Sequence, residues 1–120
     1  MHTTQIAAFT RMLAEGRDNA LLRFGLGQAL LADGQPAAAI EHLRAAVTHD
    51  PNYSAAYKLL GRALVEDGNR DAARDVFGTG IAVAEQRGDV QAAREMKVFL
   101  KRLDKLDASA PPPTGPPTTE

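Results

Sequence analysis

Two stretches of the chain decide its fold: LGQALLADGQPAAA at residues 26–39 and LGRALVEDGNRDAA at residues 60–73. The second stretch follows the first by 34 residues, and 8 of its 14 positions carry the same amino acid. The shared amino acids are leucine, glycine, alanine and aspartate, so most of them are small or apolar. Self-similarity at a fixed period of a few tens of residues is typical of proteins built from stacked structural repeats.

Each stretch, together with the residues on either side of it, predicts two helices joined by a tight turn. We call each such pair of predicted helices a copy. In the first copy, Leu22, Leu26 and Leu30 recur at a spacing of four and define one apolar helix face, which ends at Gly34. Pro36 suits the first turn of a second helix, because that position has no use for the N–H group that proline lacks. The second copy repeats this arrangement, with a glycine again at the turn.

Polar residues next to these helices predict where the helices begin. We expect Asp18 to cap the first helix, and Asp50 with Pro51 to begin its counterpart in the second copy. Asn69 is expected to cap the second helix of that copy, and Asp89 to cap a further helix near the C-terminus.

The 34-residue length, the Leu-Gly pairs at 26–27 and 60–61, the glycine at each turn and the early alanines Ala39 and Ala73 resemble the tetratricopeptide repeat. The resemblance covers residues 20–86. It implies an all-α fold of about six helices, in which antiparallel helix pairs form a right-handed superhelix. The paired glycines are expected where the two helices of a repeat cross, with Ala39 and Ala73 as the small partners that allow a close approach.

The chain departs from the family pattern in three places. The large aromatic residue early in the first helix is Tyr57 in the second copy, but Arg23 stands there in the first copy. Gly80 replaces an alanine late in the second helix, and Glu85 stands where a terminal proline is usual. We therefore expect this last repeat helix to continue to about Arg87.

These patterns predict a single domain over residues 1–107. Its parts are a helix of a preceding half-repeat at 3–16, repeat one at 20–53, repeat two at 54–87 and a capping helix at 89–107. Residues 108–120 hold five of the seven prolines and no large apolar side chain, so we expect a disordered tail there.

The composition excludes several classes of function. The 120 residues include no cysteine, which rules out disulfides, thiolate metal sites and cysteine nucleophiles. The 14 lysines and arginines balance 15 acidic residues, so the net charge favours neither nucleic acid nor a membrane surface as a partner. No export signal and no membrane-spanning apolar run is evident, and we expect a cytoplasmic protein.

No pattern predicts catalysis, a cofactor or a metal. Ser54 and Ser109 are the only serines, and neither lies in a glycine-flanked turn that would expose a nucleophile. His42 and His49 are seven residues apart on one predicted helix, about 10 Å along its axis, which is too far for both to hold one metal ion. We therefore expect a protein that is not an enzyme.

The resemblance implies a protein interaction module or adaptor that binds a peptide segment of a partner protein in a concave groove, lined by the first helix of each repeat. Carried over by position, and extended to basic side chains of the capping helix, the groove residues are Leu21, Phe24, Gln28, Leu31, Lys58, Arg62, Val65, Lys97 and Lys101. Their positive charge favours an acidic or C-terminal segment as the partner. The alternative is a self-associating structural subunit, as a homodimer or within a larger complex.

Overall fold

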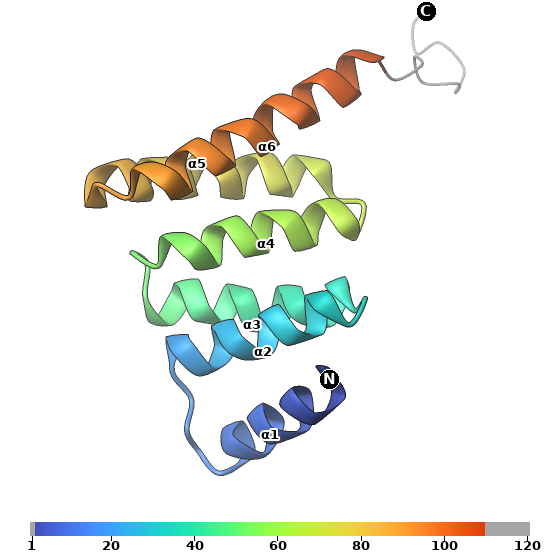
Figure 1. The fold of residues 1–120 in the computed structure, drawn as a ribbon, viewed down its shortest axis with the longest axis vertical. Coiled ribbons are helices and arrows are strands. Elements are labelled where there is room, and N and C mark those ends of the chain that lie inside the picture. Colours follow the sequence, from blue (N-terminus) through green and yellow to red (C-terminus); the bar gives the residue numbers. More distant parts are fainter. Residues whose placement is uncertain (1, 110–120) are drawn as a thin grey trace, which may run out of the picture.

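Residues 2–109, the part of the protein that our computed structural model describes, fold into six α-helices joined by short loops (Figure 1). In chain order they are α1 (His2–Ala14), α2 (Ala20–Ala32), α3 (Pro36–His49), α4 (Ser54–Glu66), α5 (Arg70–Arg87) and α6 (Val90–Ser109). The predicted all-α helical repeat is confirmed. α6 includes Ala108 and Ser109, and the rest of the expected tail, residues 110–120, lies outside the described residues. None of the described helices is long and apolar enough to cross a membrane.

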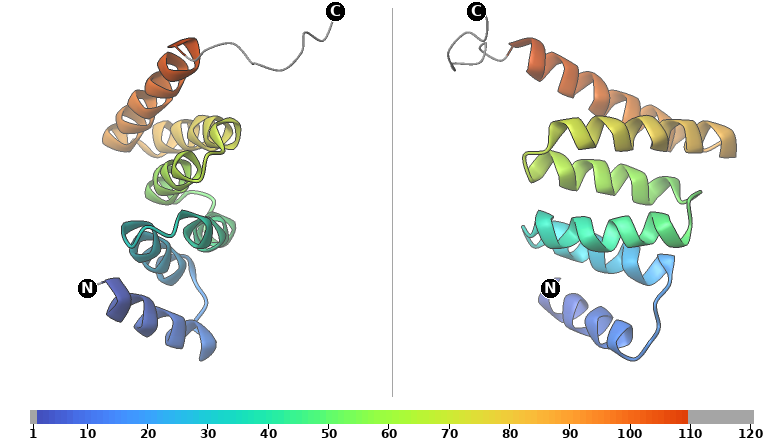
Figure 2. Two further views of the ribbon diagram at one scale, coloured as in Figure 1. Left: turned by 90° about the vertical axis from the view of Figure 1, so that its right-hand side faces the viewer. Right: turned by 180° about the vertical axis from the view of Figure 1, so that it is seen from behind.

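The helices stack in two layers along an elongated body of 56 × 33 × 25 Å. α2, α4 and α6 lie in one layer, and α3 and α5 lie in the other (Figure 2). Neighbours within the first layer are in contact, α2 with α4 and α4 with α6, whereas the Cα atoms of α3 and α5 stay more than 8 Å apart. The layer of α2, α4 and α6 is therefore the tighter side of the stack, and we call it the concave layer.

Glycines end the first helix of each repeat, as predicted. Gly34 and Gly68 follow α2 and α4 with φ angles of 76° and 85°, in the left-handed region of backbone space. Glycine adopts this region without penalty because it has no Cβ to meet the neighbouring carbonyl oxygen. The chain can therefore reverse within a few residues and return α3 and α5 antiparallel to their partners.

The residues that cap the helices are the predicted ones in two cases and a different one in the third. The Oδ1 atoms of Asn69 and Asp89 each accept a hydrogen bond at 3.2 Å from the backbone N–H three residues later, so both predicted caps are confirmed. The cap of α2 is Asn19 and not Asp18, because the Asp18 carboxylate makes two hydrogen bonds with Arg23, at 2.7 and 2.9 Å.

The start of α4 also differs from the prediction. Asp50 and Pro51 belong to a turn that precedes the helix, which begins at Ser54. The Asp50 Oδ1 atom accepts a hydrogen bond from the Asn52 N–H at 3.1 Å, and the Pro51 carbonyl accepts one from the Tyr57 hydroxyl at 2.9 Å. These two bonds hold the segment as a turn and connect it to the first part of α4.

Gly27 and Gly61 lie where the two helices of each repeat cross, and the nearest neighbour of each is a large side chain of the second helix. A Cβ atom on Gly27 would stand 2.5 Å from Cγ of Leu43, and one on Gly61 would overlap the ring of Phe77. Leu43 and Phe77 are both completely buried. Each glycine therefore makes room for a large side chain that lies one helical turn beyond the alanine.

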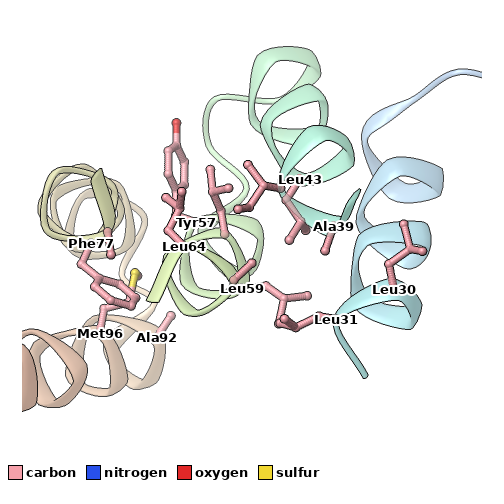
Figure 3. Packing of buried hydrophobic residues seen from close by; sticks show 14 of the residues in the cluster. Leu30, Leu31, Ala39, Leu43, Tyr57, Leu59, Leu64, Phe77, Ala92 and Met96 are labelled. Atoms are coloured by element: carbon pink, nitrogen blue, oxygen red, sulfur yellow. The ribbon is translucent and has the colours of Figure 1, made fainter. Parts of the chain in front are cut away.

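One apolar core runs through both repeats and into α6 (Figure 3). Met96 of α6 is completely buried and lies beside Phe77 of α5. A Cβ atom on Gly80 would stand 2.5 Å from the Met96 sulfur and 2.7 Å from the Tyr57 Cβ. The glycine that replaces the usual alanine in α5 therefore allows α6 to approach closely.

Polar bonds fix α6 at both of its ends. Near its start, the Ser54 hydroxyl donates a hydrogen bond to the Asp89 carboxylate at 2.8 Å. Near its other end, Arg74 pairs with Asp104 at 3.3 Å, and Arg70 of α5 pairs with Asp107 at 3.0 Å. The direction of α6, which runs obliquely to α4 (Figure 1), is thus set by apolar packing and by ion pairs to α5.

α1 is held more loosely than the other helices. None of its residues is buried, and it packs on α2 alone. The ring of Phe9 lies over Gly25, where an added Cβ atom would stand 3.1 Å from the ring. α1 is therefore held by a few partly buried apolar side chains.

Candidate functional site

The concave layer carries two groups of accessible side chains, and the first lies at the N-terminal end of the stack. A hollow of about 570 Å³ opens between α1 and α2. Its lining includes the predicted residues Leu21, Phe24 and Gln28, together with Phe9 and Met12 of α1. Leu21 is 72% exposed, so an apolar surface is open to a partner here.

The turn before α4 holds Phe24 in place. The rings of Phe24 and Tyr53 stack with their centroids 4.9 Å apart and an angle of 29° between their planes. Tyr53 is itself partly buried, and this burial raises the pKa of its hydroxyl. Because Phe24 is anchored in this way, its ring forms a fixed wall of the hollow.

The second group lies between α4 and α6, where two adjacent hollows of about 330 and 250 Å³ share a boundary. Both hollows are lined by Arg62, Phe99 and Arg102. We call the pair of hollows the α4–α6 trough. Its lining residues come from α4 and α6, whereas those of the first hollow come mainly from α1 and α2. Figure 2 shows α1 and α6 at opposite ends of the stack.

The two ends of the trough differ in chemistry. The first hollow adds Lys58, Arg94, Glu95 and Val98 to the shared side chains. The second hollow adds Val65, Glu66, Leu103 and Leu106. The trough therefore has a basic end, which contains the predicted Lys58, and an apolar end, which contains the predicted Val65.

Lys58, which the sequence predicted to line the groove, forms an ion pair with Glu95. Its ammonium group lies 2.6 Å from the Glu95 carboxylate, and this hydrogen bond lowers the pKa of Glu95. The hydrogen bond from Gln91 lowers it further. Lys58 thus joins α4 to α6 and has its charge compensated by Glu95.

Two arginines flank one aromatic ring in the middle of the trough. The guanidinium carbons of Arg62 and Arg102 lie 5.8 and 5.7 Å from the centroid of the Phe99 ring, within the range of a cation–π interaction. Phe99 in turn stacks on Phe77, with centroids 5.6 Å apart and ring planes 10° from parallel. Because Phe77 is completely buried, the core supports the ring that positions both arginines.

Three predicted groove residues lie away from these hollows. Leu31 is buried and belongs to the core. Lys97 pairs with Glu85 of α5, with 2.7 Å between Nζ and Oε2. Lys101 is exposed but lines neither hollow of the trough.

The sequence placed α6 beside the groove through Lys97 and Lys101, but it missed Arg94, Val98 and Arg102, because the repeat spacing changes there. α2 begins at residue 20, α4 at residue 54 and α6 at residue 90, so the spacing is 34 residues and then 36. A shift of 36 residues aligns Arg94 of α6 with Lys58 of α4, and Val98 with Arg62. A comparison of the chain with itself at 36 residues would have found this signal.

Both histidines of α3 have protein partners. Nη1 of Arg23 lies 3.0 Å from Nδ1 of His42, and Nε2 of His49 lies 3.0 Å from Oδ1 of Asp18. Arg23 also binds Asp18, and mainly for this reason the pKa of the Asp18 carboxyl lies well below its usual range. This network joins the loop before α2 to α3.

The comparisons with known proteins agree with this geometry. Residues 30–96, more than half of the chain, match the family model of the tetratricopeptide repeat. The chain belongs to this family. Tetratricopeptide-repeat domains generally serve in protein–protein interactions, and the fold supports that general role for this chain.

Relatives extend the match over most of the chain. It is 49% identical over 100 residues to TPR repeat-containing protein PA0015 of Pseudomonas aeruginosa, which covers 83% of this chain and 95% of the relative. The solution structure of protein BPP2914 from Bordetella parapertussis is 47% identical, with a TM-score of 0.76 over 86% of this chain and 90% of that one. The Sgt2 TPR domain from Aspergillus fumigatus, 23% identical, shares the fold with a TM-score of 0.76 over 99% of this chain and 79% of its own.

Proposed function

We propose that this tetratricopeptide-repeat protein is a non-catalytic interaction module or adaptor, in which residues 1–107 act as one domain. Its concave layer binds a peptide segment of a partner protein. The observation that carries this proposal is the pair of accessible sites on one layer, the hollow beside α1 and the α4–α6 trough. Extended peptides commonly dock in grooves with apolar pockets and a few charged groups.

The residues that we propose to contact the peptide are those that line these sites. Leu21, Phe24 and Gln28 serve at one end of the layer, and Arg62 and Val65 at the other. An acidic or C-terminal segment suits the basic side chains of the second site, because carboxylates form their strongest hydrogen bonds with cationic donors.

Titration of the isotopically labelled protein with a peptide library tests this function. We expect amide shift changes on α2, α4 and α6. Changes confined to α3 and α5 would contradict the groove assignment.

A double variant, Lys58→Ala with Arg62→Ala, should bind the selected peptides more weakly with little change in melting temperature. Both side chains lie partly or fully at the surface, where single ion pairs contribute little stability.

The second candidate is self-association, and the exposed apolar residues of the chain favour it. Leu21 is 72% exposed and Val90 is 63% exposed. Contacts between such residues in two copies would bury apolar surface. Sedimentation velocity at increasing protein concentration separates the candidates, because a protein that stays monomeric at high concentration cannot rely on self-association.

A further inference from the structure

The hollow between α1 and α2 has an apolar surface with one aromatic ring from each helix. Phe9 of α1 and Phe24 of α2 both line it, together with Met12 and Leu21. Phe24 is stacked on Tyr53, with ring centroids 4.9 Å apart, which fixes the position of its ring. Leu21 is 72% exposed, so this surface is open to solvent. A partner that packs on aromatic rings and aliphatic groups therefore fits the hollow.

The polar side chains around the hollow can all donate hydrogen bonds. They are Arg17, Asn19 and Gln28, and among the described residues that line the hollow none is acidic. The Asn19 side-chain oxygen already accepts the bond from the Leu22 N–H that caps α2, so its amide hydrogens remain to donate. Arg17 lies 3.9 Å from Glu15, and both side chains are more than half exposed. A segment that offers acceptors and few donors is complementary to this rim.

The chain itself contains a segment with this chemistry. Three consecutive prolines at 111–113 begin two residues after the end of α6. They lie outside the described part of the chain, but their sequence fixes their chemistry. Proline has no N–H, so such a run presents carbonyl acceptors without donors. It also favours a polyproline II helix, which loses little conformational freedom when it docks against aromatic residues. The proline run therefore complements both the rings and the rim of the hollow.

The length of the proline run also fits the hollow. On α2 the lining extends from Leu21 to Gln28, which corresponds to about 10 Å at the rise of an α-helix. Three residues of polyproline II span about 9 Å and form one turn of that helix. One turn therefore covers the part of the hollow that α2 provides.

A proline run in this hollow must belong to a second copy of the chain. Pro111 is two residues beyond Ser109, the last residue of α6, so their Cα atoms are at most about 7 Å apart. No Cα atom of α6 lies within 8 Å of one in α1 or α2. α4 lies between α2 and α6 (Figure 1), and packed helix axes are about 8–10 Å apart, so α2 is about 16–20 Å from α6. The run is therefore too close to α6 to lie across the hollow of its own copy.

We propose that residues 111–113 of one copy bind in the hollow between α1 and α2 of a second copy. This inference rests on the proposed function, since it names an occupant for one of its two peptide sites. The proline rings pack on Phe9 and Phe24, and the Gln28 amide donates to a proline carbonyl. A neighbouring copy then competes with a partner peptide for this hollow, while the α4–α6 trough stays open.

Mixing two forms of the full chain tests this contact by nuclear magnetic resonance. The isotopically labelled form keeps its hollow but loses its proline run, through Pro111→Ala, Pro112→Ala and Pro113→Ala. Unlabelled wild-type protein supplies the run. We expect amide shift changes at Leu21 and Phe24 of the labelled form, and no changes when the unlabelled protein carries the three alanines as well. Equal changes with both unlabelled proteins would overturn the inference.

Sedimentation velocity on the full chain measures the strength of the contact. The triple alanine variant should associate about tenfold more weakly than the wild type, because it lacks the occupant. Leu21→Gln should weaken association by about the same factor, since it removes an exposed apolar side chain from the hollow without disturbing the core.

Val90→Gln is the matched control, because Val90 is 63% exposed and lies outside the hollow. It should associate as the wild type does, and a loss equal to that of Leu21→Gln would contradict the proposed contact. A wild-type chain that stays monomeric at the highest attainable concentration would contradict it too.

The inference and the proposed function fail in different ways. If library peptides shift amides on α2, α4 and α6 but wild-type protein shifts none, the proposed function stands and the contact between copies falls. If neither library peptides nor wild-type protein shifts these amides, both fall.

Discussion

Single residues decide how closely the helices of each repeat approach, and glycine is the most sensitive of them. Leucine at position 61 would collide with the ring of Phe77, which is completely buried and cannot move into solvent. We expect Gly61→Leu to lower the free energy of unfolding by about 3 kcal/mol, the upper end of the range for overpacked cores. Urea denaturation followed by circular dichroism measures this loss.

Gly78 offers the matched control for this substitution. It lies in α5, is exposed, and has nothing within 4 Å of the position that a Cβ atom would take. Gly78→Ala should therefore raise the free energy of unfolding by up to about 1 kcal/mol, through helix propensity alone. If both variants lost stability equally, the close approach at Gly61 would not be the cause.

His42 is expected to make the stability of the protein depend on pH. Burial first, and the charge of Arg23 second, lower the pKa of His42 below its ordinary value of 6.5. Since Arg23 can only donate, Nδ1 of His42 accepts its hydrogen bond, which requires an unprotonated nitrogen. The unfolded chain therefore takes up this proton at higher pH than the folded chain, and the stabilisation present above pH 6.5 is lost as the pH falls below it.

Melting temperatures measured between pH 7.5 and pH 5 check this dependence. The wild-type protein should lose stability over this interval, whereas His42→Gln should lose less, because its side-chain oxygen still accepts from Arg23 but has no proton to bind. If the melting temperatures of the two proteins fell equally with pH, groups other than His42 would be responsible for the pH dependence of stability.

Among the helices, α1 is the element most prone to open by itself. Its contacts are with α2 only, and Phe9 over Gly25 is its central contact. We expect Phe9→Ala to speed amide hydrogen exchange in α1 at least tenfold while α4 and α5 keep their protection. Thr4→Ala on the exposed side of the same helix should leave all rates unchanged, and a uniform loss of protection in the Phe9 variant would contradict local opening.

The spacing of the elements explains what could be predicted from sequence. The period of 34 residues located the paired helices of both repeats, because turn glycines and buried apolar positions recur with it. It did not locate the groove face of α6. α5 has 18 residues against 14 in α3, and the loop before α6 is shorter, so the spacing becomes 36. Two extra residues turn a helix by about 200°, enough to exchange its faces.

The cap of α2 shows a different limit of sequence reasoning. Asp18 and Asn19 are adjacent and both are good capping residues, so propensity alone cannot choose between them. The choice depends on Arg23 and His49, which bind Asp18 and leave Asn19 for the helix end. Because His49 lies 31 residues from Asp18, this information exists only once the repeat has folded.

For the molecule as a whole, the core that crosses the repeat boundary predicts cooperative unfolding. α3 packs on α4 as part of one apolar cluster that extends from Leu26 to Leu103, so neither repeat has a core of its own. In repeat proteins, such shared interfaces couple the stability of neighbouring units. We therefore expect residues 20–103 to unfold as one unit, with only α1 opening beforehand.

This cooperativity is tested by asking whether two spectroscopic probes report the same unfolding transition. Tyr53 and Tyr57 lie at the junction of the repeats, and the chain has no tryptophan, so tyrosine fluorescence reports on the junction. Its transition in urea should match that of the far-ultraviolet circular dichroism, which reports on all helices. Two separate midpoints would contradict a shared core. Coincident midpoints would imply that a peptide bound only in the α4–α6 trough also stabilises α2 and α3, because ligand binding raises the stability of the whole cooperative unit.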